Sequence, residues 1–163
     1  MEVTLRLPIL TDAQTILAWE NNPENWEVSD NDSPYSIEDI ETLIQSFYGA
    51  ERPSQLRFMI CLGDHLLGAV DIFDINYEFK SGSIGILIAQ DEFRRKGYAS
   101  RALERVEEEA KKLGIFQLKA VIHTNNRGSR NLFEKAGYTM TFNDKNEHTN
   151  NSIEVEKWVG KEL

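Results

Sequence analysis

The chain has 163 residues, of which 40% are hydrophobic and 28% are charged, and its formal net charge is −9. This length and mixture predict that residues 1–163 fold as a single soluble domain with its own core, and no apolar run approaches the roughly 20 residues that span a bilayer. The acidic balance argues against nucleic-acid binding, which needs Lys and Arg patches, and it suits either a cationic substrate or solubility alone.

Cysteine, histidine and the first residues bear on location and metal binding. Met1–Arg6 lacks the basic region and apolar segment of a signal peptide, and Cys61 has no second cysteine with which to form a disulfide. Both features favour a cytoplasmic location. Because His65, His123 and His148 are isolated in the sequence, they do not form a ligand set with Cys61, and no metal is expected.

The N-terminal part of the chain predicts a strand followed by two helices. Residues 3–9 have strand composition. A capping signal at Thr11 opens a helix that the Asn22-Pro23 pair ends. A second helix begins after Ser36 as N-cap and carries an apolar stripe to Phe47.

Between these two helices, residues 23–35 form an acidic loop with two aromatic side chains. Loops of this length inside a small domain are often functional. Trp26, Glu27 and Tyr35 are therefore candidate substrate-binding residues for a cationic group. The alternative is a solvated loop that two buried aromatic side chains hold in place.

The rest of the chain predicts strands and two more helices. The strands are expected at residues 56–62, 66–74, 83–89, 116–123, 138–142 and 153–159. A long amphipathic helix runs to about Leu113, with Glu107–Lys111 and Glu108–Lys112 spaced as i,i+4 ion pairs. Since this helix lies between two strands, those strands should be parallel neighbours with a right-handed crossover.

The segment before the long helix, residues 94–100, has the composition of an anion site. Arg94, Arg95 and Lys96 stand together in an otherwise acidic chain, and Gly97 follows them. A glycine-containing loop at a helix N-terminus offers free backbone N–H groups and the positive end of the helix dipole. This arrangement predicts binding of a phosphate or pyrophosphate.

Two motifs carry a resemblance to a known family. The first is Arg-x-x-Gly-x-Ala, formed by Arg94, Gly97 and Ala99. The second is Asn126 followed by the run Leu132-Phe133-Glu134-Lys135-Ala136-Gly137-Tyr138. With these motifs at this separation, the sequence resembles the GCN5-related N-acetyltransferase (GNAT) superfamily, in the branch of ribosomal-protein alanine and spermidine acetyltransferases.

The resemblance implies a mixed α/β fold. Its sheet would be mostly antiparallel, with about six to seven strands, one splayed parallel pair (residues 83–89 and 116–123) and about four flanking helices. It also implies direct acetyl transfer from acetyl-CoA to a primary amine in a ternary complex. The acceptor would be a polyamine, a small amine or a protein N-terminus, and pairing of two chains into a homodimer is an alternative to a monomer.

The family's cofactor site transfers to this chain residue by residue. The pyrophosphate would lie on the N–H groups of residues 94–99, the pantetheine arm would pair with the strand backbone as in β-augmentation, and the second motif would flank the arm. The implied cofactor-binding residues are Leu87, Ile88, Ala89, Arg94, Arg95, Lys96, Gly97, Tyr98, Ala99, Ser100, Asn126, Phe133 and Lys135. For Asn126, a plain N-cap is the alternative reading, and both can hold.

The usual side-chain catalysts are missing. Many family members have Glu at the position of Ile84 and Tyr at that of Phe133, and neither residue here can exchange a proton. Catalysis by positioning with water as proton carrier is one explanation. Catalysis by other groups is the second, with His123, Asp71 and Asp74 as candidates. A non-catalytic acyl-CoA-binding module of the same fold is the alternative function.

Overall fold

The computed structural model describes residues 2–23, 34–89, 91–141 and 151–160. Its strands are β1 (Val3–Arg6), β2 (Leu56–Leu62), β3 (His65–Asn76), β4 (Ser81–Ile88), β5 (Gln117–His123), β6 (Thr139–Met140) and β7 (Ser152–Trp158). Its helices are α1 (Ala13–Asn21), α2 (Ile37–Ser46), α3 (Tyr98–Lys112) and α4 (Arg127–Lys135), with short 3-10 turns η1 (Leu10–Asp12) and η2 (Asp91–Phe93).

The strands form one sheet in the order β1-β2-β3-β4-β5-β7-β6. The β4–β5 pair is parallel, and the other neighbours are antiparallel. This confirms the mixed α/β fold with one parallel pair. The strand expected at 138–142 is shorter, because β6 covers Thr139–Met140 and residues 142–150 lie outside the described part of the chain.

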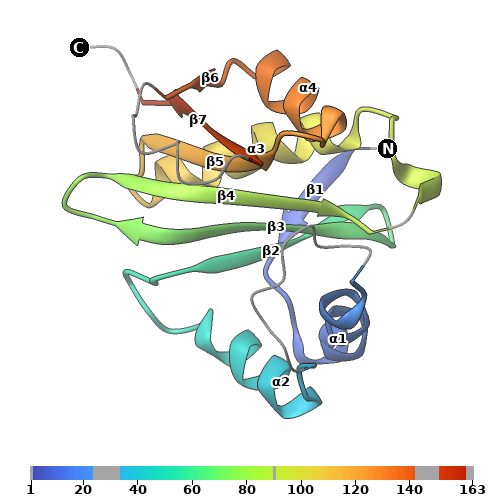
Figure 1. The fold of residues 1–163 in the computed structure, drawn as a ribbon. Helices are drawn as coiled ribbons and strands as arrows, with labels where there is room; N and C mark the ends of the chain where they lie inside the picture. Colours follow the sequence, from blue (N-terminus) through green and yellow to red (C-terminus); the bar gives the residue numbers. More distant parts are fainter. Residues whose placement is uncertain (1, 24–33, 90, 142–150, 161–163) are drawn as a thin grey trace.

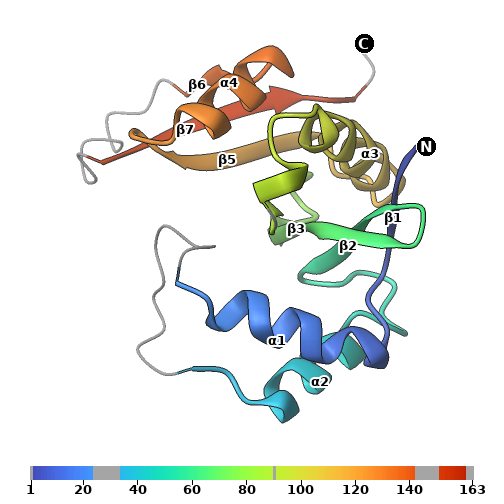
Figure 2. The same ribbon diagram turned by 90° about the vertical axis from the view of Figure 1, so that its right-hand side faces the viewer.

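Helices cover both sides of the sheet. In Figure 1 the α1–α2 pair lies at the bottom, beneath β2 and β3, whereas α3 and α4 lie at the top, beside β5 and β7. Figure 2 shows the same separation from the side. Alternate residues of β2 divide accordingly. Met59 and Cys61 pack in a cluster with α1 and α2, whereas Phe58 and Ile60 belong to the larger core cluster that contains α3.

Helix α3 has a buried face that includes one charged residue. Ala102, Leu103, Val106 and Ala110 are fully buried, at the spacing that the sequence predicted. Glu107 is also buried, at 8% exposure, and the prediction that it pairs with a lysine one turn on is wrong. The actual surface pairs of α3 are Lys111–Glu108 and Lys112–Glu109.

Glu107 instead connects α3 to the C-terminal part of the sheet. Its Oε2 accepts a hydrogen bond of 2.9 Å from the Tyr138 hydroxyl, and Lys157 Nζ lies 3.1 Å from its Oε1. A buried carboxylate needs such partners, since an unpaired buried charge is costly. None of the described helices combines the length and apolar character that a membrane crossing requires.

Candidate functional site

Strands β4 and β5 separate along their length. Their parallel register covers Ser81–Ser83 of β4 against Gln117–Lys119 of β5. Beyond that point β4 follows β3 as far as Ile88, and β5 follows β7 as far as His123. The opening between residues 84–88 and 120–123, called the gap below, leaves one edge of each strand without a strand partner. It is the splay that the sequence resemblance implied.

Register determines which backbone groups of β4 face the gap. Lys80 O accepts hydrogen bonds from the N–H groups of Phe116 and Gln117 (2.9 and 3.0 Å), on the β5 side. Ala89 N–H donates to Leu67 O (2.8 Å), on the β3 side. Because backbone groups alternate between the two sides of a strand, the even-numbered residues of β4, including Ile86 and Ile88, direct their N–H and C=O groups towards the gap.

This alternation distinguishes the three β4 residues that were expected to pair with the pantetheine arm. Of the three residues expected to pair with a ligand, Ile88 faces the gap. Leu87 and Ala89 are odd-numbered, so their backbone N–H and C=O groups are directed to β3, where the Ala89 N–H is already bonded. Ile86 takes their place as the second residue whose backbone faces the gap, and sequence alone could not identify it because register is not visible in sequence.

The segment 94–100, called the phosphate loop below, leads from the gap to α3. Gly97 is the N-cap of α3 with a φ of 83°, and Arg95 also has a positive φ of 63°. A Cβ atom at Gly97 would meet nothing within 4 Å, so the protein leaves open space there. The first intrahelical bond runs from Arg101 N–H to Gly97 O (3.3 Å), which leaves the N–H groups of residues 98–100 without an intrahelical acceptor.

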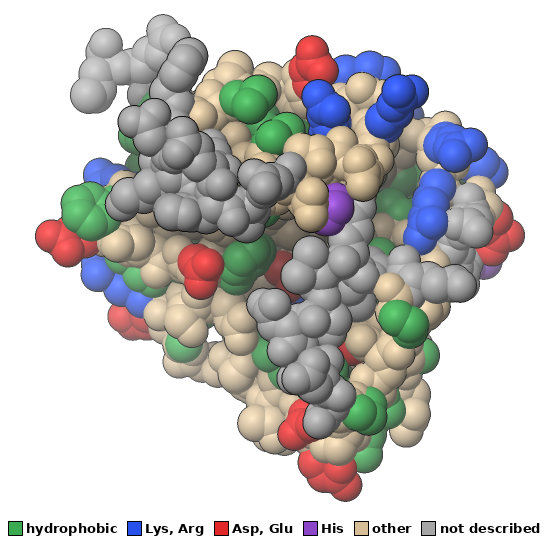
Figure 3. Space-filling model, viewed as in Figure 1, with side chains coloured by type: hydrophobic (Ala, Val, Ile, Leu, Met, Phe, Trp, Pro, Cys, Tyr) green, Lys and Arg blue, Asp and Glu red, His purple; other side chains and the backbone are tan. Residues whose placement is uncertain are grey.

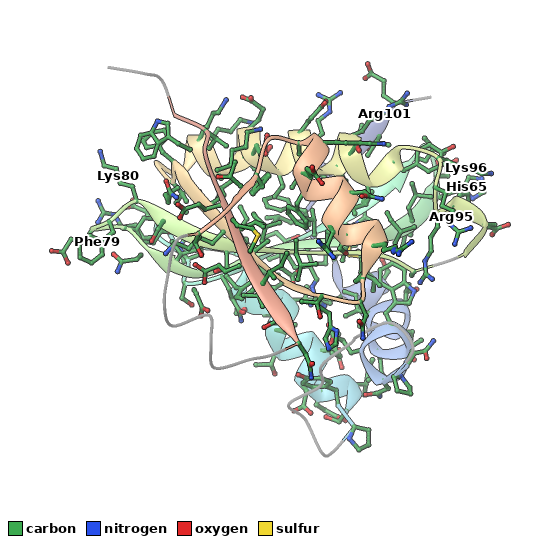
Figure 4. All side chains as sticks on the ribbon, turned by 45° about the horizontal axis from the view of Figure 1, so that its top comes forward. His65, Phe79, Lys80, Arg95, Lys96 and Arg101 are labelled. Atoms are coloured by element: carbon green, nitrogen blue, oxygen red, sulfur yellow. The ribbon has the colours of Figure 1, made fainter. Side chains whose placement is uncertain are left out.

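Cationic side chains surround this loop. In Figure 3, Lys and Arg side chains gather at the upper right, over α4 and the segment that precedes α3. Figure 4 shows Arg95, Lys96 and Arg101 at the same end of the molecule, with His65 from the start of β3. The Arg94 side chain turns back to the sheet, where its Nε donates to Ile88 O over 3.0 Å. Positive charge and free N–H groups therefore coincide at the N-terminus of α3.

The second motif builds α4. Asn126 is its N-cap, with Oδ1 accepting from Ser129 N–H at 3.0 Å, which confirms the capping reading. Phe133 is buried at 3% exposure and packs edge-on against Tyr138, with ring centroids 5.0 Å apart. Lys135 lies exposed in the last turn. Phe133 is thus a core residue, so α4 presents other side chains to the surface.

Two of the three candidate catalytic residues share a face of the sheet. Asp71 pairs with Gly85, and Ser83 pairs with Lys119, so their side chains lie on the side of α1. His123 follows Lys119 by four residues in β5 and therefore lies on the same face, across the gap. His123 thus lies at the β5 edge of the gap, whereas Asp71 lies on the same face of the sheet in β3, one strand away from the gap.

Asp74 is placed elsewhere. It has a φ of 49° and follows Phe73, which pairs with Ser83. Asp74 therefore lies near the beginning of β4, where β4 and β5 still pair, rather than beside the gap. The structure does not bring it together with the other two candidates.

One of the candidate substrate-binding residues belongs to the described part of the chain. Tyr35 is 38% exposed, and its backbone is held by the Asn21 side chain, which accepts from Tyr35 N–H (2.9 Å) and donates to Tyr35 O (3.1 Å). Trp26 and Glu27 lie outside the described residues. The end of α1 therefore fixes the C-terminal end of the acidic loop.

A buried arginine that the sequence analysis missed lies beside Asp71. Arg57, in β2, is 8% exposed and donates from Nε and Nη2 to the two oxygens of Asp71, at 2.7 and 2.8 Å. Its Nη1 also lies 2.6 Å from Glu20 Oε1 of α1. Burial alone lowers the pKa of Arg57, but the two carboxylates outweigh it and raise that pKa above its ordinary value. An arginine inside an apolar strand is the signal that could have revealed this cluster.

The described residues contain no group of three or more His, Cys, Asp or Glu side chains that could hold a metal ion. A surface cavity of about 740 Å³ lies beside α3 and the start of β1, and its lining includes Glu2, Arg101 and Glu104. That cavity lies away from the gap. The candidate site is therefore described by the gap and the phosphate loop and does not include the cavity.

Comparison with known proteins agrees with this geometry. A family model described as an acetyltransferase (GNAT) domain matches residues 2–139. No curated protein sequence matches the chain significantly. Among solved structures, a spermidine N-acetyltransferase from Vibrio cholerae in complex with CoA and spermine is 21% identical, with a TM-score of 0.75 over 95% of this chain and 93% of its own.

Two further solved structures have the same fold. An N-acetyltransferase from Staphylococcus aureus Mu50 is 20% identical, with a TM-score of 0.77 over 98% of this chain and 100% of its own. The microcin C7 self immunity acetyltransferase MccE, in complex with acetyl-CoA and AMP, is 19% identical, with a TM-score of 0.75 over 96% of this chain and 92% of its own. At these identities the likeness shows the fold alone.

Proposed function

The chain belongs to the GNAT acetyltransferase family, and on this premise we propose that it transfers the acetyl group of acetyl-CoA to a primary amine. The observation that carries the proposal is the gap between β4 and β5, with the phosphate loop at its mouth. A strand edge without a partner offers hydrogen bonds to an extended amide-containing chain, and the helix N-terminus beside it offers them to phosphate.

Acetyl-CoA fits these two features. Its pyrophosphate would accept hydrogen bonds from the N–H groups at the start of α3, where Gly97 leaves open space. Its pantetheine amides would pair with the backbone of Ile86 and with the N–H group of Ile88, whose carbonyl oxygen accepts from Arg94. A backbone N–H near the end of β4 would then stabilise the thioester oxygen as negative charge develops on it.

Proton transfer is assigned to His123 with water. The amine must lose a proton to attack the thioester carbon, and the departing thiolate gains one. Ile84 and Phe133 are buried and have no ionisable group, whereas His123 is partly exposed beside the gap, on the α1 side of the sheet, called the acceptor face below. An imidazole nitrogen can accept that proton and pass it to water. Positioning of the two substrates supplies the rest of the rate enhancement.

The acceptor class is a cationic amine. The chain has a formal net charge of −9, and Asp71 lies on the face of the sheet opposite α3, in β3 and beside Gly85 of β4, which borders the gap. One solved structure of the same fold is a spermidine N-acetyltransferase with spermine bound. A polyamine or small diamine therefore fits better than an uncharged amine, and a protein N-terminus is the second acceptor to test.

Two measurements on the full-length protein test this function. Acetyl-CoA should raise the melting temperature, since a ligand that binds the folded state stabilises it. Free CoA thiol should then appear when polyamines, small amines and N-terminal peptides are supplied. A raised melting temperature without thiol release across the panel would establish an acyl-CoA-binding module instead. The absence of both responses would refute the cofactor assignment itself.

A further inference from the structure

Arg57 organises a charged cluster on the acceptor face. Every residue of β2 is buried, and the guanidinium is the strand's one cationic group. It holds Asp71 with two parallel hydrogen bonds of 2.7 and 2.8 Å and contacts Glu20 at 2.6 Å. Bidentate geometry of this kind fixes the carboxylate plane as well as its position.

The cluster lies one strand away from the gap. Asp71 pairs directly with Gly85 of β4, which has no side chain, and a Cβ atom at Gly85 would have Phe73 Cε1 as its nearest neighbour, at 3.5 Å. The Asp71 carboxylate is directed towards Arg57 of β2, and on its other side Gly85 places no β4 side chain between Asp71 and the gap.

The same cluster is tied to the acidic loop. Glu20 and Asn21 are consecutive residues at the end of α1. Glu20 holds Arg57, and Asn21 holds the backbone of Tyr35. Consecutive residues of α1 thus hold Arg57, and through it Asp71, and the backbone of Tyr35.

Charge and exposure distinguish the three side chains. Two carboxylates and one guanidinium leave a formal charge of −1, and the exposed fraction of the side chain rises from 10% for Arg57 to 14% for Glu20 and 25% for Asp71. Each oxygen of Asp71 accepts one hydrogen bond from Arg57 and keeps a further lone pair. The uncompensated charge therefore has its most accessible atoms at Asp71, where a second cation can bind.

We propose that Arg57 is a positioning residue that holds Asp71 as the anchor for the second ammonium group of a diamine or polyamine acceptor. The inference rests on the proposed function, because it assigns one charged end of the acceptor to Asp71 while the other, neutral amine attacks the acetyl group. Asp71 acts here as an anchor rather than as the base.

Selectivity between two acceptors of equal length tests this role. The full-length protein is given 1,6-diaminohexane or hexylamine, and kcat and KM are measured for each. The wild-type enzyme should prefer the diamine, and D71N and R57M should each lose that preference by about tenfold or more, mainly through KM, because a charge-assisted hydrogen bond contributes about 1.5–3 kcal/mol. R57K should recover part of it, since lysine supplies the charge without the bidentate geometry.

R6M is the matched control. Arg6 forms a similar bidentate pair with Asp12, at 2.7 and 3.0 Å, away from the gap. R6M should lower the melting temperature without changing the ratio of kcat/KM for the two acceptors. If R57M also lowers stability while leaving that ratio unchanged, Arg57 is structural only and the proposal is overturned.

Binding without turnover separates this proposal from the proposed function. Calorimetric titration of each amine into the CoA-saturated protein needs no acetyl transfer. The wild-type protein could bind the diamine selectively, lose this selectivity in D71N and R57M, and yet release no thiol. That result would support Asp71 as the anchor and refute the acetyltransferase activity. Thiol release with equal selectivity in wild type, D71N and R57M would retain the enzyme and refute the anchor. If the protein shows no thiol release and no selective binding, both proposals are refuted.

Discussion

Arg94 and Ile88 are joined across the turn between β4 and α3, because Arg94 Nε donates a hydrogen bond of 3.0 Å to the Ile88 carbonyl oxygen. Ile88 is the last residue of β4, and its backbone faces the gap. The first residue of the phosphate loop is therefore fixed to the end of the strand along which the pantetheine arm is proposed to lie. Loop and strand edge form one unit, so a change at Arg94 affects both.

Replacement of Arg94 should separate its hydrogen bond from its charge. R94M removes both, and we expect acetyl-CoA affinity to fall about tenfold, equivalent to one charge-assisted hydrogen bond. R94Q keeps an N–H donor for Ile88 O and should retain more affinity than R94M. Calorimetric titration of acetyl-CoA measures both. Equal losses in the two variants would show that the charge, and not the contact with Ile88, is what matters.

Gly97 should be required for cofactor binding and Gly49 should not. Both have open space around the position of a Cβ atom and nearly the same φ, 83° and 84°. A valine at either position is strained in this region and should cost about 1–2 kcal/mol of stability. Only G97V places methyl groups where the pyrophosphate is proposed to bind, so only G97V should abolish the rise in melting temperature with acetyl-CoA. Cofactor binding by G97V at wild-type strength would refute the phosphate assignment.

Much of the fold was predictable because it depends on local patterns. Alternating apolar residues gave the strands, and the amphipathic stripe of residues 102–110 gave α3 and its buried face. The strand-helix-strand order then required β4 and β5 to be parallel neighbours. The glycine at the N-cap of α3 was visible for the same reason, since a positive φ of 83° at a helix start is a local requirement.

The contacts that the sequence did not reveal join residues far apart in the chain. Arg57 finds its partners at positions 20 and 71, and Glu107 finds one at position 157 rather than one turn along α3. Spacing within a helix identifies neighbours on that helix, and it says nothing about a strand that packs against it. Likewise, the backbone groups of Ile86 rather than those of Leu87 face the gap because of sheet register, which local sequence patterns do not reveal.

Asp12 should make stability fall in acid. Burial raises its pKa, but hydrogen bonds from Arg6 and from Ile9 N–H outweigh burial and hold the pKa below its ordinary value of 3.8. The unfolded chain therefore binds the proton more readily, so the contribution of Asp12 is complete above about pH 3.8 and is lost as pH falls further. D12N should cost about 1–2 kcal/mol at neutral pH, measured by urea unfolding.

The difference between wild type and D12N should shrink as pH falls from about 4 to 2, since protonated aspartic acid and asparagine are both uncharged. R6M supplies the control. The Arg6 guanidinium is the main cause that lowers the pKa of Asp12. In the R6M background, D12N should therefore change the pH dependence of stability much less. If the free energies of unfolding of wild type and D12N differ by a constant amount across this pH range while Arg6 is present, the assignment is contradicted.

Tyr138 should make stability fall in alkali. Burial, the charge of Glu107 and the hydrogen bond to Glu107 all raise the pKa of Tyr138 above its ordinary value of 10.0. The folded protein therefore holds the phenolic proton more tightly than the unfolded chain. Its contribution is complete below about pH 10 and decreases above it, by at most about 1.4 kcal/mol per pH unit. Y138F has no such proton, so its stability should decline less steeply.

Unfolding in urea between pH 8 and pH 11 measures this effect. At pH 8 the free energy of unfolding of wild type should exceed that of Y138F by about 1–2 kcal/mol, because the phenylalanine leaves one buried lone pair of Glu107 unsatisfied. That advantage should diminish above pH 10. Lys157 also contacts Glu107, so the comparison is repeated in K157M, where the wild-type tyrosine should still confer the steeper decline. Parallel curves for tyrosine and phenylalanine in both backgrounds would show that the buried hydrogen bond between Tyr138 and Glu107 does not form.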